Sequence, residues 1–150
     1  MLLILCFSAL AWAQQYGTKE ECVMKRHEAA ALINSKGLDE AIKEIAGPEG
    51  PFVWKDSYEF LMNMDGKMLA HPMQSELTKL PHCLLITDST EKALFVSFVN
   101  LAKTVGHGRV EYMWPRPGHK SPLKKIMYIY RARGRDLFVG ARVYVGGMMY

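Results

Sequence analysis

The strongest constraint on the fold comes from two neighbouring apolar runs near the C-terminus. Ile126 to Tyr130 and Leu137 to Val145 are separated by a turn at Gly134, and both runs are apolar on both sides. Strands of this kind are covered on both faces of a sheet. A short turn between two strands also makes them antiparallel. The sequence therefore predicts a central antiparallel pair with other elements packed above and below it.

The first half of the chain supplies helices that can cover such a sheet. Thr18 followed by Glu21 is a capping-box pattern, and the helix formers from Lys19 to Lys36 end at Gly37, a typical C-cap. A second short helix is expected from Asp39 to Ala46. One face of the first helix is predicted to lie against the sheet, and its residues are Val23, His27, Ala30, Ala31 and Asn34.

Beyond Phe52 the apolar period changes to that of a strand. The inward positions are Tyr58, Phe60, Met62 and Met64, and the outward positions are Glu59, Leu61 and Asn63, as in a half-buried strand. Asp65-Gly66 is a strong hairpin signal, so Lys67 to His71 is predicted as the return strand. Pro72 ends this strand, because proline cannot donate a hydrogen bond to the sheet.

The remaining segments predict one more cover and one more strand. Met73 to Thr87 is long for a passive connection, which indicates a loop that covers something. Asp88 to Glu91 is a capping signal before a helical stripe from Leu94 to Val105, and Val110 to Trp114 alternates as a strand. The order predicts an α+β fold, in which an antiparallel sheet of about five strands carries the long N-terminal helix on one face.

The N-terminal residues predict export. Residues 1–13 are uncharged and end in an A-x-A pattern, so we expect a signal peptide followed by one domain over residues 14–150, in the periplasm or outside the cell. A membrane anchor is the alternative, but a spanning helix needs about 20 apolar residues. Of the three cysteines, Cys22 and Cys83 remain after cleavage; they could pair, although two thiols are the favoured reading.

Charge and motifs restrict the class of partner. From Arg116 to Arg142 eight basic residues face one acid, Asp136, which suits an anionic surface or ligand. Export argues against nucleic acid. The enzyme motifs GxSxG and HExxH and a phosphate-binding loop are missing, and no cysteine and histidine spacing suits zinc. The sequence predicts no catalytic residue, metal or cofactor, and a small anion is the expected partner.

Amphipathic aromatic residues recur at the predicted strand positions. They are Trp54, Tyr58, Tyr112, Trp114, Tyr128 and Tyr130. Each one alone is more often a core residue, but together they suit the lining of a small pocket. Lys125 and His71 lie near strand ends of the same sheet, and a lysine buried there needs a partner. An ammonium group, tyrosine hydroxyls and a histidine N–H together suit a small carboxylate.

Four stretches of the chain resemble a known family. GPFVWKDSYEFLMNMDGKMLAHP, AKTVGHGRVEYMWPRPG, KIMYIYR and DLFVGARVY closely resemble the exported single Cache domains of bacteria in their standalone form. The resemblance covers Thr18 to Tyr144, and its motifs are specific as an ordered set. It implies a PAS-like fold, with a long N-terminal helix packed on a central antiparallel sheet and a small-molecule pocket on the other face.

The resemblance implies an extracytoplasmic sensor that binds a short organic acid such as acetate, propionate or pyruvate. It would signal through a separate membrane-bound receptor or histidine kinase, and a homodimer through the N-terminal helix is compatible with it. The ligand-binding residues implied by position are Trp54, Tyr58, Phe60, His71, Pro72, Tyr112, Trp114, Lys125 and Tyr128. Strand alternation places Lys125 and Tyr128 on opposite faces, so these two implied positions conflict.

Two departures from the family pattern leave an alternative open. Arg109 stands where an aromatic residue follows the second glycine, and Arg142 replaces a small residue before the terminal V-Y. If either arginine fills the anion position, the pocket is closed and the domain is a structural or protein-interaction module without a ligand. An enzyme would instead need a base such as His71 beside a nucleophile or a bound metal.

Overall fold

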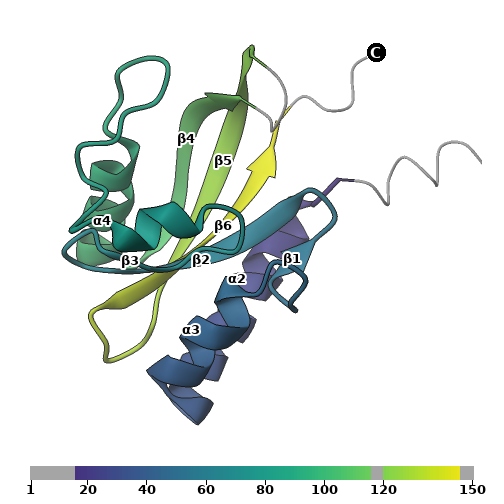
Figure 1. The fold of residues 1–150 in the computed structure, drawn as a ribbon, viewed down its shortest axis with the longest axis vertical. Coiled ribbons are helices and arrows are strands. Elements are labelled where there is room, and N and C mark those ends of the chain that lie inside the picture. The colour runs from purple at the N-terminus through teal and green to yellow at the C-terminus, as the bar shows by residue number, and fades with distance from the viewer. Residues whose placement is uncertain (1–15, 116–119, 146–150) are drawn as a thin grey trace, which may run out of the picture.

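The computed structural model describes residues 16–115 and 120–145, which form an α+β fold around one antiparallel sheet (Figure 1). This sheet has six strands in the order β1-β2-β6-β5-β4, and β3 pairs with β2. The strands are β1 (Val53–Trp54), β2 (Ser57–Asn63), β3 (Met68–Ala70), β4 (His107–Pro115), β5 (Pro122–Arg131) and β6 (Leu137–Tyr144). The predicted fold class is confirmed, and the two-residue β1 is the strand for which the sequence had no pattern.

The two apolar runs near the C-terminus form the centre of the sheet. β6 pairs with β5 on one side and with β2 on the other, antiparallel in both cases. Every residue from Leu137 to Arg142 is buried. The predicted central pair, covered on both faces, is therefore confirmed.

Helices α2 (Lys19–Lys36) and α3 (Leu38–Ala46) lie side by side and cover one face of the sheet, the helix face (Figure 1). The capping box predicted at the start of α2 is present, and Gly37 ends the helix with φ +88°. Of the predicted inward stripe, Ala30 is buried and Val23 is half-buried against the sheet, but the other three positions are exposed. The buried residues are Cys22, Ala29, Ala30 and Ile33. Arg26 lies on this inward side, where its Nη1 donates to the Ile129 carbonyl at 2.8 Å, so polarity did not reveal the buried face.

The outward side of β2 is not exposed, contrary to the half-buried strand that the alternation predicted. Glu59 and Leu61 are both fully buried. Leu61 packs with residues of both helices, such as Ala29 and Ile45. The helix pair therefore covers β2 as well as the central strands.

The opposite face of the sheet, the pocket face, is covered by α4 (Leu94–Thr104) and by the segment after β3, which contains the short helix η1 (Ser75–Lys79). Leu77 and Ile86 of this segment pack on the core beneath α4, so the prediction of a covering loop is confirmed. The capping signal at Asp88 does not start a helix. Its carboxylate instead accepts from the backbone N–H groups of a turn and from Met113 N in β4 at 2.9 Å.

Two predictions concern the ends of the chain and its cysteines. The predicted signal peptide, residues 1–13, lies outside the described residues. In the described ranges, no helix is long and apolar enough to cross a membrane. Cys22 and Cys83 are both buried and free, and they pack in clusters on opposite faces of the sheet.

Candidate functional site

Two adjacent chambers lie on the pocket face. The outer chamber, of about 750 Å³, is bordered by the β1–β2 turn, the last residues of β4 and β6, and Lys125 in the first half of β5. The inner chamber, of about 240 Å³, lies beneath α4 and η1. Residues common to both linings are Tyr58, Gln74, Trp114 and Lys125. A ligand at this border would touch polar groups on one side and apolar groups on the other.

Lys125 is the cation at the border between the chambers. Its register in the sheet places it opposite Tyr112 of β4 and Tyr144 of β6. The ammonium Nζ lies 4.5 Å from the ring centroid of Tyr144 and 6.0 Å from those of Tyr112 and Trp114. The side chain is only 3% exposed, and no described acidic residue forms an ion pair with it. Burial, assisted by the nearby Arg142 charge, lowers the pKa of Lys125 to about 6.

Arg142 is a second buried cation and lines the outer chamber. Its guanidinium carbon lies 4.2 Å from the ring centroid of Tyr58 and 4.8 Å from that of Tyr144. Burial alone would lower the pKa of Arg142, but the tyrosine oxygens around it raise this pKa above its usual value, so the side chain is charged. Its Nε and Nη1 are buried without a hydrogen-bond partner. Arg109 lies elsewhere, opposite Tyr128 and exposed, so it does not fill the pocket.

His71 is buried at the end of β3 and lines the inner chamber. Its Nδ1 accepts hydrogen bonds from the backbone N–H groups of Met73 at 3.2 Å and Gln74 at 2.9 Å. Burial, together with the charges of Arg142 and Lys125, lowers the pKa of His71 to about 4. The neutral ring must therefore carry its proton on Nε2. This leaves one N–H donor for a ligand, while Nδ1 holds the turn after the strand.

Aromatic side chains form the floor and the far wall of the inner chamber. The ring of Phe98 contacts the ring of Phe60 on one side and that of Tyr112 on the other, with centroid distances of 6.1 and 5.6 Å. A Cβ atom added to Gly140 would lie 2.6 Å from the Phe60 ring, so only glycine lets that ring lie on β6. Burial raises the pKa of Tyr112 well above its usual value. Its hydroxyl is therefore neutral and can donate to an acceptor in the chamber.

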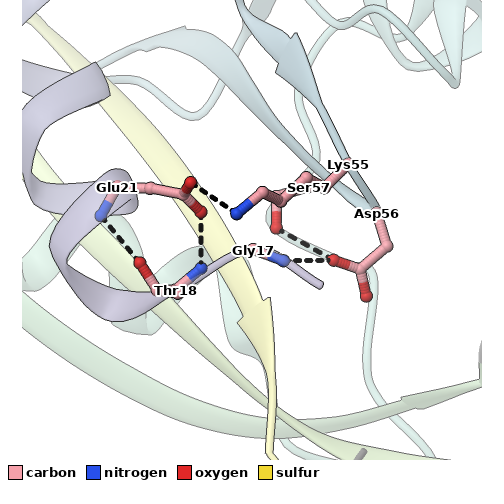
Figure 2. Close-up of polar contacts among 6 residues, drawn as sticks. All are labelled: Gly17, Thr18, Glu21, Lys55, Asp56 and Ser57. Atoms are coloured by element: carbon pink, nitrogen blue, oxygen red, sulfur yellow. Dashed lines mark hydrogen bonds and ion pairs between the residues drawn. The ribbon is translucent and has the colours of Figure 1, made fainter. Parts of the chain in front are cut away.

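The N-terminal end of α2 is tied to the rim of the outer chamber, as Figure 2 shows. Gly17 N donates to Asp56 Oδ1 at 2.8 Å, and Lys55 Nζ lies 2.6 Å from Glu21 Oε1. The other oxygen of Glu21 accepts from Thr18 N at 2.9 Å and closes the capping box. Lys55 and Asp56 also line the outer chamber. One polar network thus links the pocket rim to the first turn of the long helix.

The structure brings together most of the predicted site residues. Those that line a chamber are Tyr58, Phe60, His71, Tyr112, Trp114 and Lys125. Trp54 and Tyr128 do not, because they pack with Cys22 on the helix face. Pro72 is buried beside His71 but lines neither chamber. Of the conflicting pair, Lys125 lines both chambers and Tyr128 lies on the opposite face of the sheet, as strand alternation requires.

Several lining residues were missed by sequence reasoning. Gln74 borders both chambers, and the α4 residues Phe95 and Phe98 line the inner one. A helical stripe carries no sign of which residues face a cavity, so their role could not be separated from core packing. Tyr144 could have been found, because alternation along β6 places it on the same face as Arg142. Among the described residues, no group of three or more side chains is arranged to hold a metal ion.

Comparisons with known proteins agree with this architecture. A family model described as Cache domain matches residues 9–148. A solved structure concerning carboxylic acid recognition by a Cache chemosensory domain has a TM-score of 0.70 and 25% identity, over 93% of this chain and 99% of that one. The periplasmic sensor domain of a chemotaxis protein has a TM-score of 0.65 and 22% identity, over 85% and 90%, and supports the fold alone.

A curated relative is also similar in sequence. That relative, the methyl-accepting chemotaxis protein McpP of Pseudomonas putida, is 32% identical to this chain over 90 residues, which are 60% of this chain. The match spans only 16% of the length of McpP. The similarity therefore concerns one segment of a much longer protein.

Proposed function

The chain belongs to the Cache domain family, and we propose that it is a sensor domain that binds a short organic acid between the two chambers. One observation carries this proposal: a buried lysine without an ion-pair partner faces a cavity. A buried charge is costly unless it is paired. A ligand carboxylate would supply the missing partner of Lys125, and the charge would then be stabilised in the occupied state.

The groups around Lys125 favour a carboxylate over other anions. The Nε2–H of His71 and the hydroxyl of Tyr112 are donors in the same chamber, and together with the ammonium group they can satisfy both oxygens of one carboxylate. The rest of the inner chamber is lined by apolar side chains such as Phe98. At about 240 Å³ it is smaller than the pockets of about 300 Å³ and more that hold drug-sized ligands. This supports an acid with a short carbon chain.

We further propose how the binding of a ligand is transmitted from the site to the rest of the protein. The β1–β2 turn lines the outer chamber and holds the first turn of α2 through Lys55 and Asp56 (Figure 2). A ligand that moves this turn would move the helix start with it. The signal would then pass to a membrane-bound receptor or kinase, either directly or through a homodimer formed along α2. Such a role requires an exported domain, with residues 1–13 as signal peptide and residues 14–150 as the sensor.

A closed module without a ligand is the second candidate. The observation in its favour is that Arg142 lines the outer chamber, with its guanidinium carbon 4.2 Å from the ring centroid of Tyr58 and 4.8 Å from that of Tyr144. Two chambers nevertheless stay open beside it. In the closed module, Arg142 would be a permanent substitute for the ligand, and acids would have no effect on the protein.

Thermal unfolding of the purified protein distinguishes the two candidates. Each short acid is paired with its uncharged amide: acetate with acetamide, propionate with propionamide, and succinate with succinamide. We expect at least one acid, and none of the amides, to raise the melting temperature, because a ligand that binds only the native state stabilises it. If no acid shifts the melting temperature at concentrations up to several millimolar, the sensor proposal fails and the closed module is favoured.

A further inference from the structure

We propose that Arg142 is a second anion-binding group of the same site, and that the preferred ligand is a short dicarboxylate. This inference rests on the proposed function, because it assigns a partner to the ligand's second acidic group. The first carboxylate would lie at Lys125, on the border of the chambers. The second would lie in the outer chamber, against the guanidinium of Arg142.

The state of the guanidinium is the first observation. Arg142 is 5% exposed, and its Nε and Nη1 have no hydrogen-bond partner. Leaving two buried donors of a charged group unpaired costs several times more than an ordinary lost hydrogen bond. The rings of Tyr58 and Tyr144 lie close to the guanidinium carbon, at 4.2 and 4.8 Å from their centroids, but these contacts leave Nε and Nη1 without an acceptor. A carboxylate is a suitable acceptor for such a group, since hydrogen bonds between a guanidinium and a carboxylate are charge-assisted.

The placement of the two cations is the second observation. Lys125 lies opposite Tyr144 in the sheet, and Arg142 is two residues before Tyr144 on the same face of β6. The two residues are thus diagonal neighbours, a relation in which side chains start about 7–8 Å apart. Lys125 borders both chambers, whereas Arg142 lines the outer one only. Two cations at this separation suit two carboxylates joined by a short carbon chain better than one shared carboxylate.

The charge balance of the outer chamber is the third observation. Its acidic lining residue is Asp56, and the Oδ1 of this carboxylate already accepts from Gly17 N and from Ser57 Oγ. The lining residue Lys55 is paired with Glu21. No ion pair connects Asp56 to either buried cation among the described residues. The chamber therefore has positive charge that its own side chains leave uncompensated.

Isothermal titration calorimetry with ligands of equal carbon number tests the inference. The pairs are malonate and propionate, succinate and butyrate, and glutarate and valerate, so that members of a pair differ by one carboxylate. We expect at least one diacid to bind about tenfold or more tightly than its paired monoacid, the value of one good charge-assisted contact. In Arg142→Gln we expect that diacid to lose about tenfold in affinity, while the monoacid changes less than about threefold. Arg109→Gln, which removes an exposed arginine on the helix face, is the matched control and should change neither.

The outcomes separate this inference from the proposed function. If monoacids bind as tightly as diacids in the wild-type protein, Arg142 has no second carboxylate to recognise and the inference is overturned, although the sensor function stands. A diacid preference that survives in Arg142→Gln has the same meaning. If neither class binds, both proposals fail. Should Arg142→Gln not fold, which its thermal unfolding would show, the wild-type comparison alone decides.

Discussion

The two faces of the sheet bury ionisable groups of opposite type, basic on one face and acidic on the other, and their surroundings differ. On the pocket face, Lys125 and Arg142 are buried and border open chambers. On the helix face, Glu59 is fully buried beneath α2, and neither of its carboxyl oxygens has a hydrogen-bond partner. Desolvation raises the pKa of Glu59 well above its usual value, although the nearby Lys25 opposes this effect. Both faces therefore hold an ionisable group in a site that disfavours its charged form.

The difference between the faces is what can relieve that cost. A ligand can enter beside Lys125, so its charge can be restored by binding. Glu59 is enclosed by the helix and the sheet and borders neither chamber. It can only stay protonated or destabilise the fold. A buried ionisable residue therefore indicates a binding site when space for a partner lies next to it, and indicates only a stability cost when no such space exists.

The substitution with the largest expected effect on the pocket face is Lys125→Met. We expect affinity for a binding acid to fall about 100-fold or more, because the charge-assisted contact is lost. The ligand-free variant should gain roughly 2–4 kcal/mol in unfolding free energy at pH 7. The unfolded lysine keeps its proton up to its usual pKa, near 10.5, whereas the folded one loses it near 6. The gain is therefore largest below pH 6 and disappears as the pH approaches 10.5.

Calorimetry and denaturant unfolding at several pH values measure the two effects of this change. The control is Lys124→Met, which removes the preceding lysine; that side chain is exposed and pairs with Glu111 at 2.8 Å. It should leave both affinity and stability nearly unchanged. An unchanged affinity in Lys125→Met would show that Lys125 does not bind the ligand, and would contradict the comparison of the two faces.

On the helix face, Glu59→Gln should act on stability alone. The folded pKa of Glu59 lies above the unfolded value, so the folded state is favoured at acidic pH and loses stability as the pH rises toward that folded pKa. The glutamine variant lacks this loss. We expect its free energy of unfolding to equal that of the wild type near pH 4.5 and to exceed it by a growing margin up to pH 8. Denaturant unfolding across this range, with acid affinity as the second readout, would refute the comparison if affinity changed more than about twofold.

A smaller effect on acid affinity is expected when one tyrosine on each face of the sheet is replaced by phenylalanine. Tyr112 lines the inner chamber, and Tyr128 packs on the helix face. Tyr112→Phe removes one hydroxyl donor and should weaken acid binding about fivefold, the value of one hydrogen bond. Tyr128→Phe should leave the dissociation constant within about twofold. Equal losses in the two variants, measured by calorimetry, would contradict the assignment of the pocket to one face.

Much of the fold followed from local patterns. The capping box at Thr18, the hairpin turn at Gly66 and the apolar runs of β5 and β6 each depend on neighbouring residues in the chain, and the structure contains all of them. The failures concern tertiary contacts. Alternation along β2 could not show that two helices cover Glu59, and the capping pattern at Asp88 serves a turn that is held against β4.

The candidate site was predictable only in part, for a similar reason. Alternation and the family resemblance together indicated Lys125, Tyr112 and His71. Trp54 is an amphipathic aromatic residue, as Tyr112 is, but it packs with Cys22 on the helix face, and a two-residue strand has no alternation that could show this. Arg142 was visible as a departure from the family pattern. Its unpaired guanidinium nitrogens depend on which acceptors lie near them in space, and no local pattern in the sequence shows that.

Proton uptake on ligand binding is the most direct test of the claim that a ligand carboxylate is the ion-pair partner of Lys125. At pH 8 a lysine with a pKa of about 6 is neutral, and a bound carboxylate raises that pKa. Titrating the acid with the largest thermal shift at pH 8, in two buffers of different ionisation enthalpy, gives the number of protons bound. We predict uptake of about one proton per ligand in the wild type and none in Lys125→Met. Tight binding without proton uptake would contradict the account.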